Sequence, residues 1–165
     1  MTAHIRYAIE NDTCALQMKG RLTFTDGPGL DAFITWLQQQ QHVSKIVVDL
    51  SSADYLDSTM LGLLAKMWNA LHDRLKGRIV LASPKPDMSM LLRGVCFDRI
   101  FTIASQPDQA AVGYHLDDVE ALPAEAREHA KVMLESHRAL VTACEENRAA
   151  FQDIIELLEQ RSKIS

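Results

Sequence analysis

The chain has 165 residues, of which 47% are hydrophobic and 24% charged, values typical of a globular domain with an appendage. Its formal net charge is −5 and its Lys and Arg residues form no run, which argues against a surface that neutralises nucleic-acid phosphates. The first ten residues do not read as a secretory signal, and no segment approaches the roughly 18 apolar residues that span a bilayer. We therefore expect a cytoplasmic protein without membrane contact.

The cysteines and histidines do not form a metal-binding or disulfide pattern. Cys14, Cys96 and Cys144 are odd in number and far apart in the sequence. The nearest histidines on one predicted helix, His129 and His137, are separated by about 12 Å along the helix axis. We expect idle thiols, no bound metal and no cofactor.

The first 104 residues alternate between strand and helix patterns. Residues 5–9 and 14–18 predict a β-hairpin that turns around Asn11 and Asp12. In chain order there follow a helix at residues 26–37, a β-branched strand typical of a central position at 46–50 and the longest helix of this part at 58–75. A strand at 79–82, a short helix at 87–94 and a last strand at 99–103 complete the alternation. Strands separated by helices imply parallel neighbours with the helices packed against the sheet.

Beyond residue 104 the sequence changes character. Residues 105–122 have a weak apolar pattern, which predicts a connection. Residues 123–165 contain neither Gly nor Pro after Pro123, which predicts a helical extension that is either coiled-coil-like or a helical hairpin. Its apolar seam has heptad spacing and is interrupted by His137 and Asn147, polar residues that set the register or mark a bend. One straight helix would span about 48 Å, so the extension either folds back near residues 145–148 or pairs with another chain. We favour a second partner or self-association as its role.

One segment contains residues with a specific chemical role. The strand Val47-Val48-Asp49-Leu50 is followed by Tyr55-Leu56-Asp57-Ser58-Thr59-Met60-Leu61-Gly62, and an Asp or Ser oxygen at such a helix start caps the unpaired backbone N–H groups. Over residues 5–104 the sequence resembles STAS domains, with Met60 where that family usually has Gly. The resemblance implies an α/β fold, a small mixed β-sheet with an N-terminal β-hairpin and covering helices, to which the C-terminal helices are added.

The resemblance also implies a function, that of a bacterial anti-sigma factor antagonist. In such proteins the residue matching Ser58 is phosphorylated by a serine kinase of the histidine-kinase-like ATPase fold, and a metal-dependent phosphatase reverses the step. Asp57, Ser58, Thr59 and Met60 are then the residues expected to bind the anti-sigma factor or an equivalent regulator. A phosphate adds about −1.5 to −2 charges beside Asp57, which would repel an acidic or apolar partner. Thr59 is the weaker candidate for the phosphate.

Three other interpretations remain open. Asp-Ser-Thr before an amphipathic helix is often only a helix cap. The STAS unit is alternatively a constitutive scaffold whose Ser58 is never modified. A hydrolase that combines Ser58 and Asp57 with a distant histidine would need an oxyanion arrangement, and the chain lacks the Gly-x-Ser-x-Gly elbow of many such enzymes. We therefore expect a protein that is not an enzyme.

Overall fold

The computed structural model describes residues 3–82, 84–107 and 113–164. The strands are β1 (His4–Glu10), β2 (Thr13–Leu22), β3 (Lys45–Asp49), β4 (Ala53–Leu56), β5 (Ile79–Ala82), β6 (Thr102–Ala104) and β7 (Asp117–Asp118). They form one mixed sheet in the order β6-β5-β3-β2-β1-β7, and β4 pairs with the second half of β2. β1 is antiparallel to both neighbours, whereas β2, β3, β5 and β6 are parallel.

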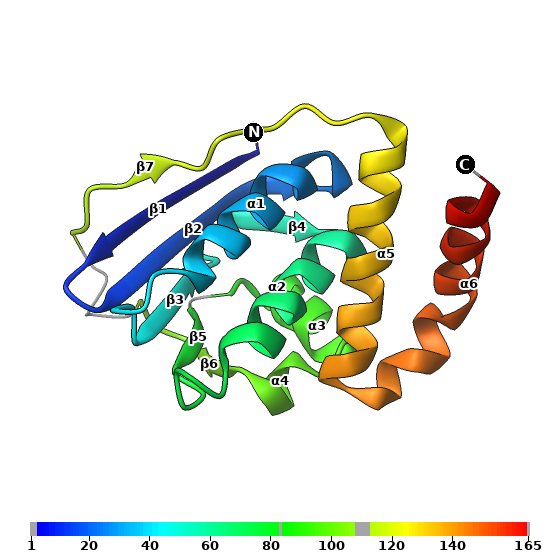
Figure 1. Ribbon diagram of the computed structural model, residues 1–165. Helices are drawn as coiled ribbons and strands as arrows, with labels where there is room; N and C mark the ends of the chain where they lie inside the picture. Colours follow the sequence, from blue (N-terminus) through cyan, green and yellow to red (C-terminus); the bar gives the residue numbers. More distant parts are fainter. Residues whose placement is uncertain (1–2, 83, 108–112, 165) are drawn as a thin grey trace.

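The helices are α1 (Gly27–Gln38), α2 (Ser58–Leu71), α3 (Pro86–Gly94), α4 (Phe97–Ile100), α5 (Ala126–Ala143) and α6 (Arg148–Ile164), with single turns η1 (Phe24–Asp26) and η3 (Glu145–Asn147). Figure 1 shows α1 and α2 in front of the sheet, α5 packed against both, and α6 on the outer side of α5. Among the described residues, no helix is long and apolar enough to cross a membrane.

The main hydrophobic core lies between the sheet and the helices. Ile46 and Val48 of β3 are fully buried in it, together with Leu64 of α2. Val47, which points to the opposite face of β3, packs in a second, smaller cluster with Val80. A strand buried on both faces is expected at the centre of a parallel sheet. The mixed α/β sheet and the hairpin predicted from the sequence are confirmed.

Local predictions were wrong in three places. The strand expected over 99–103 begins only at Thr102, because the single turn α4 comes first and buries Phe97 in the core. The helix that begins at Ser58 ends at Leu71 rather than at residue 75. The short strand β4, directly before Asp57, was not anticipated; it pairs with β2 beyond a register shift between Gly20 and Arg21.

The C-terminal extension consists of two helices that fold back on each other. Their bend is at η3, where the buried Asn147 donates from Nδ2 to the carbonyl oxygens of Val95 (3.1 Å) and Leu140 (2.9 Å). A separate apolar cluster joins α5 to α6 and contains Leu134, Val141, Ile155 and Leu158. In the preceding connection, β7 pairs with β1, and residues 108–112 lie outside the described residues. The domain boundaries at 104 and 122 and the association role stay predictions.

Candidate functional site

Asp57 joins the start of α2 to the neighbouring turn η1. It is the N-cap residue of α2, and its Oδ1 accepts a hydrogen bond from the backbone N–H of Met60 (2.9 Å). Its Oδ2 accepts from the backbone N–H of Phe24 (2.7 Å). Both carboxylate oxygens therefore hold backbone groups in place, which orients the following residue, Ser58, at the first position of the helix.

Ser58 is half-buried, and its hydroxyl meets a histidine from the C-terminal extension. Ser58 Oγ lies 2.8 Å from Nε2 of His137. The other ring nitrogen, Nδ1, lies 2.6 Å from the backbone carbonyl of Met133, which only accepts hydrogen bonds, so Nδ1 carries the proton. In the neutral ring Nε2 then accepts, and the Ser58 hydroxyl donates. The sequence marked His137 only as a polar residue in the apolar seam.

Thr59 and Met60, the other two predicted contact residues, face the interior. Thr59 is 2% exposed and Met60 is fully buried. The expected contact between a partner and the Met60 side chain is therefore corrected, because this side chain fills the core where the STAS pattern usually has Gly. Ser58 is the less buried of the two hydroxyl-bearing residues.

The outer side of α2 is a stripe formed by Ser58, Gly62, Lys66 and Asn69, here called the switch face. These residues recur at helical spacing, and α5 contacts all four. Lys66 Nζ lies 2.7 Å from Asp31 and 3.1 Å from Glu135, and Asn69 Nδ2 donates to the carbonyl of Ala139 (3.1 Å). The contact is closest at Gly62, where an added Cβ would lie 2.2 Å from the carbonyl oxygen of Ser136.

The open side of the Asp57 turn has a cation and two aromatic rings. The guanidinium of Arg21 lies 4.1 Å from the ring centre of Tyr55, and the two residues are paired across β2 and β4. Phe24 is 41% exposed, and its ring centre lies 5.4 Å from that of His129 on α5 in a T-shaped contact. Arg21, Tyr55 and Phe24 are thus the accessible contact groups around the turn.

The Ser58 and His137 pair resembles part of a hydrolase site. In a catalytic triad a carboxylate accepts from the second ring nitrogen of the histidine, but here that place is taken by the Met133 carbonyl. Asp57 is bound to two backbone N–H groups and makes no hydrogen bond with His137. The pair therefore has a serine and a base without the acidic third member.

Two of the cysteines, which the sequence treated as unrelated, lie near each other. Potential ligand atoms of Cys96, Cys144 and Glu146 are within 4.8 Å of one another. The Arg99 guanidinium donates to Cys96 Sγ (2.9 Å) and to Glu146 (2.6 and 2.8 Å), so a cation already neutralises this cluster. Burial, followed by contact with Cys144, raises the pKa of the Cys96 thiol, which disfavours the thiolate that binds metals.

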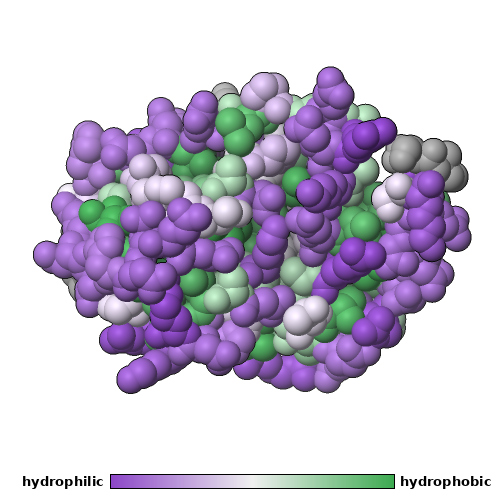
Figure 2. Space-filling model, viewed as in Figure 1, coloured by the Kyte–Doolittle hydropathy of each residue, from purple (hydrophilic) through white to green (hydrophobic). Residues whose placement is uncertain are grey.

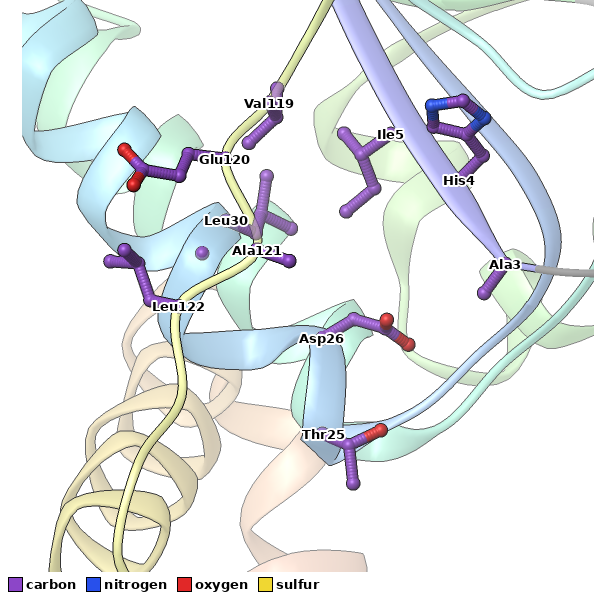
Figure 3. Close-up of a pocket in the computed structure, with 11 residues that line it drawn as sticks. Ala3, His4, Ile5, Thr25, Asp26, Leu30, Val119, Glu120, Ala121 and Leu122 are labelled. Atoms are coloured by element: carbon purple, nitrogen blue, oxygen red, sulfur yellow. The ribbon is translucent and has the colours of Figure 1, made fainter.

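A separate pocket lies between the connection that precedes α5, the start of α1 and the first residues of β1 (Figure 3). Its walls include Ile5, Leu30 and Val119. Asp26, at one end, already accepts from the backbone N–H of Thr23 (2.9 Å), and His4 pairs with Asp118 (2.6 Å). Because Asp26 and His4 already have partners, they do not form the convergent polar set that defines a catalytic site.

The fold is that of a small mixed sheet with the turn Asp57-Ser58-Thr59 at the start of its main covering helix. The family model of the STAS domain matches residues 4–110, and the chain belongs to that family. Helices α5 and α6 lie outside the matched residues. No curated protein matches this chain.

Solved structures share this fold at low sequence identity. The anti-sigma factor antagonist SpoIIAA in its unphosphorylated form is 17% identical over 66% of this chain and 92% of its own, with a TM-score of 0.52. The Bacillus cell fate determinant SpoIIAA in the phosphorylated form is 19% identical, covering 67% and 96%, with a TM-score of 0.52. An anti-sigma-factor antagonist (STAS) domain protein from Planctomyces limnophilus is 20% identical, covering 65% and 93%, with a TM-score of 0.56.

Proposed function

We propose that this protein is an anti-sigma factor antagonist that acts by partner switching and is not an enzyme. Unphosphorylated at Ser58, it binds an anti-sigma factor or an equivalent regulator; phosphorylated, it releases that partner. The observation that carries the proposal is the half-buried Ser58 hydroxyl beside Asp57 at the start of α2, next to the buried Thr59. SpoIIAA, which has the same fold, has been solved in both an unphosphorylated and a phosphorylated form.

The electrostatics of the turn support release on phosphorylation. A phosphate on Ser58 adds about −1.5 to −2 charges next to the Asp57 carboxylate. The Asp57 oxygens are already held by the N–H groups of Met60 and Phe24, so this carboxylate is fixed close to the new charge. A partner that approaches Arg21 and Phe24 with an acidic or apolar surface meets two anions instead of one.

The proposal includes the two enzymes that add and remove the phosphate on Ser58. A serine kinase of the histidine-kinase-like ATPase fold adds the phosphate, and a metal-dependent serine phosphatase removes it. All of these partners act in the cytoplasm in this proposal. The hydrolase alternative has the Ser58 and His137 contact in its favour, and a serine-reactive phosphonate probe tests it: labelling of Ser58 would contradict the non-enzymatic proposal.

The decisive experiment compares Ser58→Ala with Ser58→Asp as baits in cell lysate, with Ser51→Ala and Ser51→Asp as matched controls on an exposed serine outside the turn. We expect a protein that the alanine form captures and the aspartate form does not, whereas the two Ser51 variants capture it equally. That protein is then tested for binding to a sigma factor. Identical partners for both Ser58 variants, together with an unphosphorylated intact mass in cells, would favour the constitutive scaffold.

A further inference from the structure

The outer side of α2, which would have to be free for docking, is covered by a segment of the same chain. Ser58, Gly62, Lys66 and Asn69 all contact α5. Viewed from this side, the molecule presents a continuous and mostly hydrophilic surface with apolar patches between the polar groups (Figure 2). A partner therefore reaches the switch face only after α5 has moved.

We propose that the switch face is a helix-binding surface whose resident occupant is α5, that α5 and the external partner compete for it while Ser58 is unphosphorylated, and that phosphate on Ser58 displaces either occupant. The inference rests on the proposed function for the identity of the competitor. The surface itself specifies what fits: a helix with a small residue whose backbone approaches Gly62, a carboxylate that faces Lys66, and an acceptor for the Ser58 hydroxyl. In α5 these are Ser136, Glu135 and His137.

The contact between α5 and α2 has the composition of a reversible interface. Val132, Ala139 and Leu140 of α5 join the main core, but Ser136 and His137, which are polar, are buried beside them at 0% and 2% exposure. Such groups regain water when the helix leaves, which lowers the cost of exposing it. The Nδ1 atom of His129, also on α5, is buried without a hydrogen-bond partner, and detachment would relieve that cost as well.

The chain connection also allows α5 to leave. In the described part of the chain, all strands of the sheet except the two-residue β7, and all helices that cover it directly, lie before residue 105. Residues 119–125 between β7 and α5 form neither helix nor strand. Detachment of α5 and α6 therefore removes no strand from the body of the sheet, and the STAS match at residues 4–110 does not include them.

Phosphorylation removes the donor from the hydrogen bond between Ser58 and His137 at the centre of the contact. The Ser58 hydroxyl donates to Nε2 of His137 across 2.8 Å, and a phosphoserine ester oxygen has no proton to donate. In the neutral ring, whose Nδ1 proton is donated to the Met133 carbonyl, Nε2 then faces an acceptor. A protonated ring would instead donate to the phosphate and hold α5 in place, which is the outcome that unchanged or slower exchange of α5 would reveal. The phosphate also needs space that the backbone of α5 occupies, because Ser136 lies against Gly62 one turn further along α2.

The test follows α5 directly and needs neither kinase nor partner. Phosphoserine is installed at position 58 of the full chain by genetic code expansion, and amide hydrogen exchange is measured over residues 126–143. We expect exchange in α5 to accelerate by roughly tenfold or more, while β3 and β5 keep their protection. Phosphoserine at position 51 is the matched control and should leave α5 unchanged. Unchanged or slower exchange of α5 with phosphoserine 58 would overturn the proposal.

A second variant places the charge on α5 and leaves the switch face intact. His137→Glu buries an ionised carboxylate beside Ser58 and should release α5 with Ser58 unmodified, whereas Thr142→Glu adds the same charge at an exposed position of α5 and should not. Protection of α5 that is equal in both variants would count against the inference. If α5 is released but Ser58→Ala and Ser58→Asp bind the same partners, the proposed function fails and the inference stands. If the partners differ while α5 keeps its protection, only the inference fails.

Discussion

Replacing Gly62 with Ala tests how closely α5 is held against α2. In a helix with free surroundings this change stabilises by about 1 kcal/mol. Here the new Cβ would lie 2.2 Å from the carbonyl oxygen of Ser136, which is backbone and does not rotate away. To restore an ordinary contact of 3.4 Å, α5 has to retreat by about 1.2 Å.

This shift of α5 lowers the free energy of unfolding. A shift of that size lengthens the 2.8 Å contact between Ser58 and His137 to about 4 Å, beyond hydrogen-bond range. The lost hydrogen bond costs about 0.5–1.5 kcal/mol and the overpacking about 1–3 kcal/mol, which together exceed the gain in helix propensity. We expect a net loss of about 1–3 kcal/mol in the free energy of unfolding.

Urea denaturation followed by tryptophan fluorescence measures the loss, and amide exchange locates it in α5. Gly94→Ala is the matched control, because an added Cβ at this helical glycine meets nothing within 4 Å. Equal stability of Gly62→Ala and Gly94→Ala, or a loss of protection in α2 while α5 keeps its own, would refute the close contact between α5 and Gly62.

Three further predictions concern the core, the bend and pH. Leu64→Ala should cost about 2–5 kcal/mol in urea denaturation because Leu64 is fully buried, whereas Ser58→Ala, which loses the hydrogen bond to His137, should cost about 0.5–1.5 kcal/mol; the opposite ranking would contradict our placement of the core. Asn147→Ala should cost about 1–3 kcal/mol, since it leaves the carbonyls of Val95 and Leu140 without their donor, and a neutral outcome in the same assay would contradict this role. The hydrogen bond and charge of Arg99 lower the pKa of Glu146 from its usual 4.5. Stability from this pair is therefore present above about pH 4.5 and lost as the pH falls through the folded-state pKa, so wild type and Glu146→Gln should differ in urea titrations at neutral pH and converge in acid.

Local pattern was sufficient for the elements with strong periodicity. The hairpin, the buried strand β3 and the start of α2 at Ser58 follow from turn residues, a β-branched run and a helix cap. The pattern was insufficient for β4 and α4, which are four residues long. Pairing with β2 and burial of Phe97 decide these short segments, and neither contact has a periodic signal in the sequence.

The sequence by itself determined the family resemblance, the Asp57 and Ser58 turn and a C-terminal helical extension with polar residues at positions 137 and 147. It could not decide which of these residues marks a bend and which faces the turn. That decision came from tertiary structure: Asn147 donates to the carbonyl of Leu140 near the end of α5, which places the bend there and directs His137 toward Ser58, 79 residues away in the chain. Helical spacing defines which side chains share a face, but the surface against which that face packs depends on burial and hydrogen bonding between distant segments.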